Sequence, residues 1–382
     1  MRKPSSNGGP AVDFDALARP CLRSVKPFFP GKRLADVQRE RKLKRVVRLA
    51  SNENPLGASP RALAELRGAA PEAHRYPDCS SPLLRRAFAE AHGLDEAQVI
   101  IGNGSDEVLR LLCETLLTPE DEVVVSQYAY LRFKQHAGIL GAKVIEVPMV
   151  DWTHDLETMG RAASTRTKLV FAANPNNPTG TWNTQEEVVR LLKSLPPTAL
   201  LVLDEAYGHF AAAHAGYPES LPGLVRRFPN LFVLRTFSKA FGLAGLRVGA
   251  GVGDPALIGW LDRVRIPFNV SLPAQRAACA ALKDAAFLKK SVAACERGRE
   301  RLAGDLRRLG FSTADSAGNF LFVECPVPGH ELARGLLHLG VAVHPLDEYG
   351  LPDHVRISVG TDADHRELLR AVEGVLSERR DA

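Results

Sequence analysis

The sequence has no run of apolar residues that approaches the roughly 18 needed to cross a bilayer, so no membrane-spanning helix is predicted. Its first twenty residues start basic but contain neither an apolar core nor a small-residue cleavage site, so no secretory signal is expected. The six cysteines lie far apart and form no C-x-x-C pair, which gives no support for a zinc ribbon or a redox dithiol. Scattered cysteines fit a reducing compartment, and we expect a cytoplasmic protein without a bound metal.

A dominant charge of one sign is also missing, because 49 Lys and Arg stand against 44 Asp and Glu. The densest basic stretch is RERKLKRVVR, residues 39–48. It could bind a polyanion, or it could be the solvated face of a segment that precedes a buried strand. Since no aromatic residues interleave with the basic ones to stack on bases, we favour the solvated face and predict no nucleic-acid partner.

The chain has 382 residues, which favours two domains, and its 45% hydrophobic and 24% charged residues are typical of globular proteins. Short apolar runs alternate with helix-length amphipathic stretches such as 106–117 and 184–195, and the second opens with the capping box Thr184 to Glu187. This alternation predicts an α/β fold with a mostly parallel sheet flanked by helices. The expected strands are 99–104, 122–127, 142–149, 167–174, 199–207 and 230–238.

The alternation of strands and helices ends at about residue 275, where long charged helices (273–310) precede short strands at 319–325 and 354–360. We therefore predict a second, smaller α+β domain. The expected division is an N-terminal arm that is part of the small domain (1–48), a large domain (49–274) and a small C-terminal domain (275–382).

A lysine follows one of the predicted strands. Ser238 and Lys239 come directly after an apolar run and lead into a glycine-rich segment. The carboxyl end of a parallel strand is where α/β proteins bind ligands, and a partly desolvated lysine there could form an imine with a carbonyl group. Arg247, eight residues on, suits a phosphate. By itself this pair could equally be two surface cations.

A carboxylate, Asp204, ends the apolar run LLVL, where it needs a partner. A protonated pyridine nitrogen would serve, and so would an N-cap or an ion pair. Tyr207, three residues later, could reach the same ligand or simply pack.

Two loops complete the set of candidate motifs. In NPNNPTG (174–180) the prolines stiffen the loop that presents Asn176 and Asn177, although many such segments are ordinary tight turns. In GNGSDE (102–107) a glycine turn opens into a helix, where backbone N–H groups and the Ser105 hydroxyl could hold a phosphate. A lone G-x-G is a weak signal.

These motifs, in this order, resemble the fold-type-I pyridoxal-phosphate aminotransferases (aspartate-aminotransferase-like) and, among them, the histidinol-phosphate aminotransferases. The resemblance covers roughly residues 25 to 375. It is carried by PGK (30–32), LASNENPLG (49–57), RYP (75–77), GNGSDE (102–107), NPNNPTG (174–180), DEAY (204–207), SKAFGLAGLR (238–247) and VRISVGT (355–361).

The resemblance implies a pyridoxal 5'-phosphate cofactor and a role for each matching residue. Lys239 would form a Schiff base with the cofactor and would shuttle the proton between Cα and C4′. Asp204 would face the pyridine nitrogen, and Tyr130 would stack on the ring. Tyr207 and Asn177 would bond the ring oxygen. The cofactor phosphate would be held by Ser105, Asp106 through its backbone, Ser238, Arg247 and, from the neighbouring subunit of a homodimer, Tyr76.

On the substrate side the resemblance implies that Arg356 grips the anionic end, with Asn52 nearby. Two positions depart from the family pattern. Phe28 stands where a tyrosine is usual, and His344 stands where an arginine is common. The first change removes a hydroxyl donor to a substrate phosphate, and the second replaces a permanent cation with a weaker, pH-dependent one. Each charge-assisted bond lost in this way is worth ~1.5–3 kcal/mol.

The expected activity is transfer of an amino group from L-glutamate to imidazole-acetol phosphate, giving L-histidinol phosphate and 2-oxoglutarate in histidine biosynthesis. Phe28 and His344 would favour the alternative, an aminotransferase for aromatic or other bulky amino acids. A phosphate-handling decarboxylase and a non-catalytic binding protein on the same fold are further alternatives.

Overall fold

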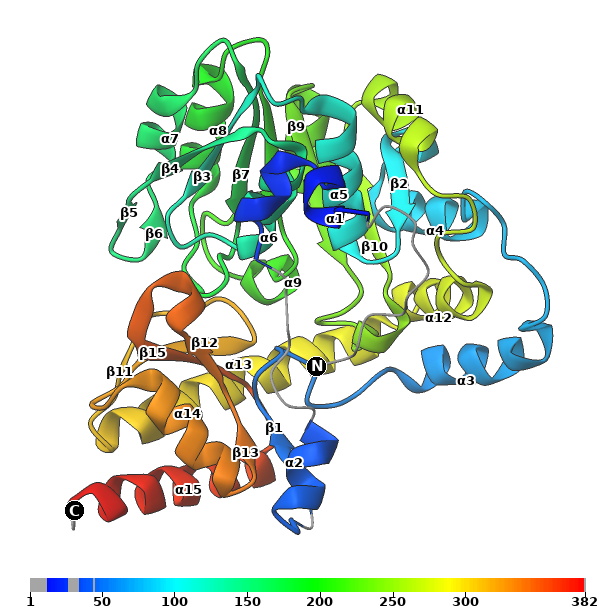
Figure 1. Cartoon of the computed structure of the whole chain (residues 1–382). Helices are drawn as coiled ribbons and strands as arrows, with labels where there is room; N and C mark the ends of the chain where they lie inside the picture. The colour runs from blue at the N-terminus through cyan, green and yellow to red at the C-terminus, as the bar shows by residue number, and fades with distance from the viewer. Residues whose placement is uncertain (1–11, 27–33, 44, 381–382) are drawn as a thin grey trace.

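The computed structural model describes residues 12–26, 34–43 and 45–380, and its larger part is built on a seven-stranded sheet (Figure 1). Five neighbouring strands are parallel, and β10 runs antiparallel to both of its neighbours. The spatial order is β2 (Val99–Gly102), β10 (Gly249–Val252), β9 (Leu231–Thr236), β8 (Leu200–Asp204), β7 (Thr167–Ala173), β3 (Glu122–Ser126) and β4 (Lys143–Val147). The predicted fold class is confirmed.

Helices cover both faces of this sheet, which is why its strands are apolar at successive positions. On β3 the side chain of Val124 packs in one apolar core, and those of Val123 and Val125 pack in the other. The first core includes α4 (Pro82–His92), α7 (Leu156–Ala162), α8 (Gln185–Ser194) and α12 (Leu272–Leu282). The second includes α5 (Ser105–Leu116), α6 (Leu131–Leu140) and α11 (Pro255–Val264). The predicted capping box of α8 is present.

Strand β10 was not among the predicted strands, because its sequence GAGV has two glycines, which strands disfavour. The packing explains them. A Cβ on Gly249 would lie 2.1 Å from the backbone nitrogen of Ser105, and one on Gly251 would lie 2.5 Å from the Phe232 ring. The glycines therefore let the start of α5 and the side chain of Phe232 approach the sheet closely.

The C-terminal part holds a four-stranded antiparallel sheet in the order β11 (Ser312–Thr313), β12 (Phe320–Glu324), β15 (Leu351–Ser358) and β14 (His344–Leu346). Helices α13 (Ala285–Arg308), α14 (Gly329–His338) and α15 (Asp362–Arg380) pack around it (Figure 1). Strand β1 (Val47–Arg48) pairs with β13 (Val341–Ala342), and Val47 and Leu49 lie in the same apolar core. The predicted boundary at 274/275 falls inside α12, and the division into domains stays a prediction.

The remaining short elements connect these parts. They are α1 (Phe14–Leu17), η1 (Pro20–Ser24), α2 (Leu34–Glu40), α3 (Pro60–Ala69), η2 (Ala70–Glu72), η3 (Glu96–Gln98), β5 (Met149–Val150), β6 (Thr153–His154), α9 (Gly208–Ala211), η4 (Ser220–Leu224), α10 (Val225–Arg227), η5 (Ala244–Leu246) and η6 (Asp347–Tyr349).

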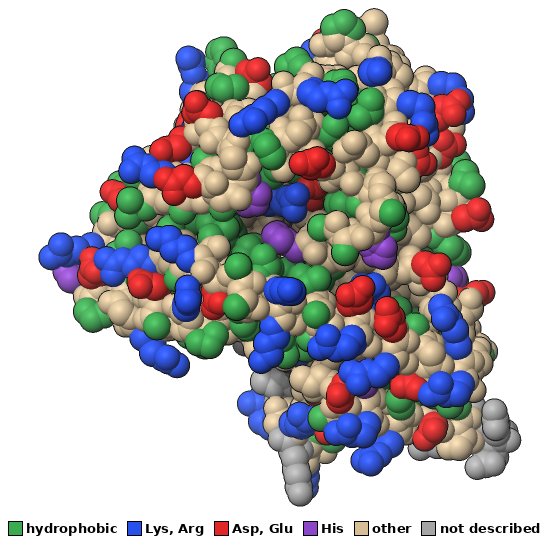
Figure 2. Space-filling view, turned by 180° about the vertical axis from the view of Figure 1, so that it is seen from behind, with side chains coloured by type: hydrophobic (Ala, Val, Ile, Leu, Met, Phe, Trp, Pro, Cys, Tyr) green, Lys and Arg blue, Asp and Glu red, His purple; other side chains and the backbone are tan. Residues whose placement is uncertain are grey.

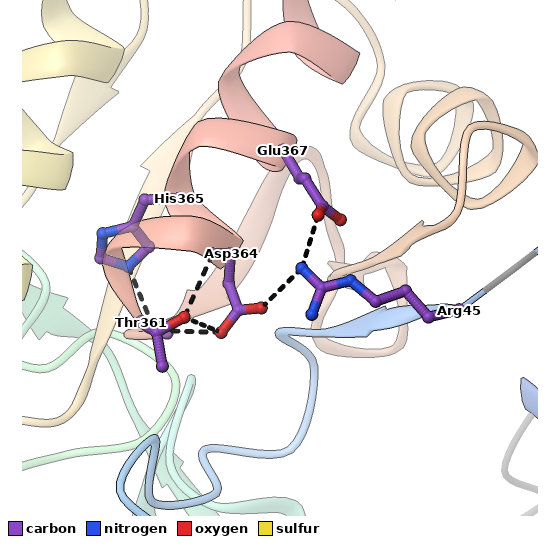
Figure 3. A network of polar contacts seen from close by, with 6 residues as sticks. Arg45, Thr361, Asp364, His365 and Glu367 are labelled. Atoms are coloured by element: carbon purple, nitrogen blue, oxygen red, sulfur yellow. Dashed lines mark hydrogen bonds and ion pairs between the residues drawn. The ribbon is translucent and has the colours of Figure 1, made fainter.

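Arginines of the basic stretch have acidic partners. Arg45 reaches Asp364 at 3.4 Å and Glu367 at 2.5 Å at the start of α15 (Figure 3), and Arg48 reaches Glu53 at 2.9 Å. On the face drawn in Figure 2, Lys and Arg side chains are interspersed with Asp and Glu. These pairings fit the solvated face that was favoured for residues 39–48.

Two searches of the described residues bear on membranes and metals. No helix formed by those residues is both long and apolar enough to cross a membrane. No group of three or more His, Cys, Asp or Glu side chains within the same residues is placed to hold a metal ion.

Candidate active site

A cavity of about 230 Å³ lies at the carboxyl ends of β7, β8 and β9, where Asp204 ends β8 and Lys239 follows β9. This is the edge of the sheet at which α/β proteins bind ligands. The residues that line it are Ser51, Glu53, Ser105, Asp106, Tyr130, Ala173, Pro175, Asn177, Asp204, Ala206, Tyr207, Thr236, Ser238, Lys239, Ala244 and Arg247. Most of the predicted cofactor residues therefore meet in one place.

One end of the cavity is suited to a phosphate. Helix α5 begins at Ser105, and among the residues that the structure describes no side chain caps it at Gly104, so its first N–H groups are suited to a ligand. Arg247 donates to the Ser238 hydroxyl at 3.2 Å. A Cβ on Gly104 would lie 2.5 Å from the Arg247 guanidinium, so this close approach requires glycine. Together these groups form an anion cradle, defined here as the start of α5 with Ser105, Ser238 and Arg247.

Lys239 lies between this cradle and the substrate side. It follows β9 within the loop that leads to η5, and it is half-buried. Its Nζ donates to the Ser51 carbonyl at 3.1 Å and lies 5.6 Å from the centroid of the Tyr207 ring. Among the described residues, this backbone carbonyl is the hydrogen-bond acceptor of Nζ, and the side chain lines the cavity.

Asp204 lines the cavity from the end of β8. Its side chain is buried, and burial raises its pKa from 3.8 to about 6, with a further contribution from the nearby Glu205 and Asp106 carboxylates. Its Oδ1 accepts a hydrogen bond from the Ala206 N–H at 2.9 Å. A cation beside this carboxylate would offset the desolvation that raises the pKa, so the position suits a protonated ring nitrogen.

Two tyrosines line the walls between these groups. Burial raises the pKa of Tyr130 well above its ordinary value, so its phenol stays protonated. The Tyr207 hydroxyl accepts a hydrogen bond from Asn52 Nδ2 at 2.9 Å. Asn52 has a left-handed backbone, with φ of 54°, and its N–H donates to the Ser358 hydroxyl at 2.7 Å. The N-terminal segment is thereby fixed to both the large sheet and β15.

Arg356 joins the two sheets on the substrate side. It projects from β15, donates to Asn177 Oδ1, and donates to the Ala50 carbonyl at 2.7 Å. Its Nε is buried without a hydrogen-bond partner among the described residues. A buried guanidinium with a spare donor is prepared to bind an anion.

Two other predicted residues, His344 and Tyr76, do not line this cavity. His344 faces Arg356 across the β14–β15 pairing, and its Nε2 is 3.1 Å from Glu348 Oε1. Tyr76 is 82% exposed, stacks on the Phe268 ring at 4.7 Å, and does not line the cavity of its own chain. Phe28 lies outside the described residues.

The sequence did not point to several groups that the structure places here. The Thr236 hydroxyl accepts a hydrogen bond from the Ser238 N–H at 3.1 Å, and Ser51 contributes only its carbonyl. Glu53 lines the cavity from the segment that contains Asn52. Thr236 could have been predicted from its position two residues before Ser238. The contribution of Ser51 could not, because a backbone carbonyl is common to all residue types.

The sheet and this cavity are those of an aminotransferase, and the chain belongs to the aminotransferase class I and II family, whose pattern matches residues 44–372. Its similarity is to histidinol-phosphate aminotransferases. It is 43% identical to the one from Moorella thermoacetica (94% of this chain, 93% of that protein) and 42% identical to histidinol-phosphate aminotransferase 2 from Pseudomonas fluorescens (96% and 99%). The crystal structure of the Sinorhizobium meliloti histidinol-phosphate aminotransferase with pyridoxal-5'-phosphate matches with a TM-score of 0.84 and 31% identity, covering 98% of this chain and 100% of that one.

Proposed function

We propose that the protein is a pyridoxal-phosphate-dependent histidinol-phosphate transaminase. It transfers the amino group of L-glutamate to imidazole-acetol phosphate, giving L-histidinol phosphate and 2-oxoglutarate in histidine biosynthesis. The observation that carries this proposal is the convergence of Lys239, Asp204 and the anion cradle on one cavity. The chain that builds this cavity is 42% to 43% identical to enzymes of that name.

The residues present fit the cofactor. The anion cradle, kept open by Gly104, would hold its phosphate, Asp204 would hold the proton on its ring nitrogen, and Tyr130 would stack on the ring. Tyr207 and Asn177 would bond the ring oxygen. When bound, the cofactor supplies an electron sink that lets the Cα–H bond of an amino acid be broken. Lys239 would take that proton at Nζ and return it, and its place in the lining of the cavity supports this role.

The substrate would lie between Lys239 and Arg356. The Arg356 guanidinium would bind the carboxylate of glutamate or the phosphate of the second substrate, and Asn52 would orient the same end. His344, opposite Arg356 on the neighbouring strand, would add a second contact to a phosphate, and this register supports the role. Phe28 and His344 would instead favour an aromatic substrate, but the similarity of the whole chain to histidinol-phosphate aminotransferases supports the phosphorylated one.

We also propose that the protein acts as a homodimer in the cytoplasm. Tyr76 is supported as a residue for the partner's phosphate cradle by its high exposure, by its place outside its own cavity and by the stack that holds it against Phe268. A reducing compartment is supported by the six free cysteines. Burial raises the pKa of the Cys113 and Cys325 thiols to about 12, so they behave as inert core residues.

Turnover of L-histidinol phosphate with 2-oxoglutarate tests the proposed activity, with glutamate formation as the readout. We expect turnover by the wild type and a loss of at least about 10²–10⁴-fold in Lys239→Ala, because proton transfer at Nζ is lost. A Lys168→Ala variant is the control, since that lysine lies on β7 outside the cavity. Wild-type protein that forms no glutamate from histidinol phosphate would refute the proposed function.

A further inference from the structure

One of the residues that line the cavity at the start of α5 carries a carboxylate, although this part of the cavity is proposed to bind a phosphate. Asp106 is the second residue of α5, and its side chain is 34% exposed. Ser105 precedes it in the sequence, and both Ser105 and Arg247 line the same cavity. The charges of Arg247 and Asp106 alone sum to zero, so the carboxylate would cancel much of the attraction that the cradle exerts on a phosphate.

The structure supplies a second cation at this carboxylate. Arg132, on the first turn of α6, donates to Asp106 through Nε at 2.9 Å and Nη2 at 2.9 Å, the bidentate arrangement of a strong ion pair. His136 is 3% exposed, with its Nε2 3.2 Å from Asp106 Oδ1 and 3.1 Å from Arg132 Nη2. Helices α5 and α6 pack against each other, so the pair is held between two rigid elements.

The pair also fixes the charge state of Asp106. Burial by itself raises the pKa of this carboxyl, but the hydrogen bonds from His136 and Arg132 outweigh burial and lower the pKa well below its ordinary range. Asp106 is therefore a carboxylate at neutral pH whether or not a ligand is bound. Its charge must be compensated by neighbouring groups rather than by protonation.

We propose that Arg132, which lies beside His136, is a charge-compensating residue of the anion cradle: it neutralises Asp106 so that the cofactor phosphate meets a net positive site. The inference rests on the proposed function, because it concerns binding of the same cofactor. It makes Arg132 a positioning residue, since this side chain does not itself line the cavity.

The test is the dissociation constant of pyridoxal 5'-phosphate for the cofactor-free protein, measured by titration. We expect Arg132→Gln to raise it about ten- to a hundred-fold, because an uncompensated negative charge then stands beside the phosphate. Combining Arg132→Gln with Asp106→Asn removes that charge, so the double variant should bind within about threefold of wild type. The dissociation constant of Arg132→Lys, which keeps the positive charge but loses the bidentate contact, should lie between those of wild type and Arg132→Gln.

Two controls separate electrostatics from damage to the fold. Pyridoxal without its phosphate should bind Arg132→Gln and wild type equally. Arg110→Gln, which removes an arginine on α5 that pairs with Glu107 and Glu114 outside the cavity, should bind pyridoxal phosphate as wild type does.

The outcomes are distinguishable. Arg132→Gln that binds as wild type does would overturn the inference, and so would a double variant that binds no better than Arg132→Gln. If the wild type itself does not bind pyridoxal phosphate, the proposed function fails instead.

Discussion

At the scale of single residues, the site is built from groups whose surroundings set their charge. Asp204 shows this most clearly, because it is a buried carboxylate whose pKa is raised to about 6 mainly by desolvation. The protein tolerates this desolvation at a position where a cationic ring nitrogen would relieve it. The free energy of unfolding of the cofactor-free protein should therefore be lower at pH values where Asp204 is ionised.

The sign of the effect follows from the raised pKa. A folded-state pKa above the unfolded value of 3.8 gives stability that is fully present below about pH 3.8 and is lost as the pH rises through about 6. At about pH 8, Asp204→Asn is expected to raise the free energy of unfolding of the cofactor-free protein by up to about 3 kcal/mol. Near pH 4 the two proteins should be almost equally stable.

Urea unfolding at the two pH values measures this difference. A gain of the same size at both, or no gain at pH 8, would contradict the assignment of Asp204 as a desolvated carboxylate. Adding pyridoxal phosphate should stabilise wild type more than Asp204→Asn, since only the carboxylate can pair with a protonated ring nitrogen.

At the scale of secondary structure, the position of α5 decides whether the anion cradle exists. The start of this helix lies against β10, where Gly249 leaves no room for a side chain. The fold therefore couples the glycines of an internal strand to the geometry of a phosphate site on the neighbouring loop.

A glycine-to-alanine pair tests that coupling. Gly249→Ala would place a Cβ 2.1 Å from the Ser105 nitrogen, so backbone must move. We expect a loss of about 1–3 kcal/mol in the free energy of unfolding, together with weaker binding of pyridoxal phosphate. Gly259→Ala, in the middle of α11 with open space around it, should be neutral or stabilise by about 0.5–1 kcal/mol. Equal behaviour of the two variants would show that the close approach is unimportant.

The same elements show what the sequence could and could not predict. Apolar runs and helical spacing identified β2, β3, β7, β8 and β9 and the helices α5 and α8, because burial on both faces leaves a strong signal. The apolar pattern did not predict β10, whose glycines are required by close packing, or strand pairings as short as β1–β13. Motifs identified Lys239 and Asp204, whereas the role of Arg132 depends on the packing of α5 on α6, which no local pattern encodes.

At the scale of the whole molecule, the site depends on contacts between the two sheets. Arg356 reaches from β15 to Asn177, which follows β7, and to the carbonyl of Ala50 in the N-terminal segment. Asn52 and Ser358 add a second link. A substrate anion bound by Arg356 would therefore tie together parts of the chain that are remote in sequence.

Replacing that arginine should separate substrate binding from cofactor binding. We expect Arg356→Lys to raise the KM for glutamate about ten- to a hundred-fold, because lysine cannot make the bidentate contact. The dissociation constant of pyridoxal phosphate should change little, since Arg356 does not line the cofactor cavity. Arg301→Lys, which changes an exposed arginine paired with Asp362, is the control. An unchanged KM for glutamate would exclude Arg356 as the substrate anchor.

The most direct test of histidinol-phosphate specificity is a half-reaction on the protein loaded with pyridoxal phosphate. L-histidinol phosphate, histidinol, phenylalanine and tyrosine are added separately, and the rate of change of the cofactor's visible absorption is compared. We expect histidinol phosphate to react at least about tenfold faster than histidinol. A tenfold difference in rate corresponds to the free energy of one charge-assisted hydrogen bond to the phosphate. Equal rates for these two would contradict the proposed recognition of the substrate phosphate. A faster reaction with phenylalanine or tyrosine would contradict the proposed substrate and make the protein an aromatic aminotransferase.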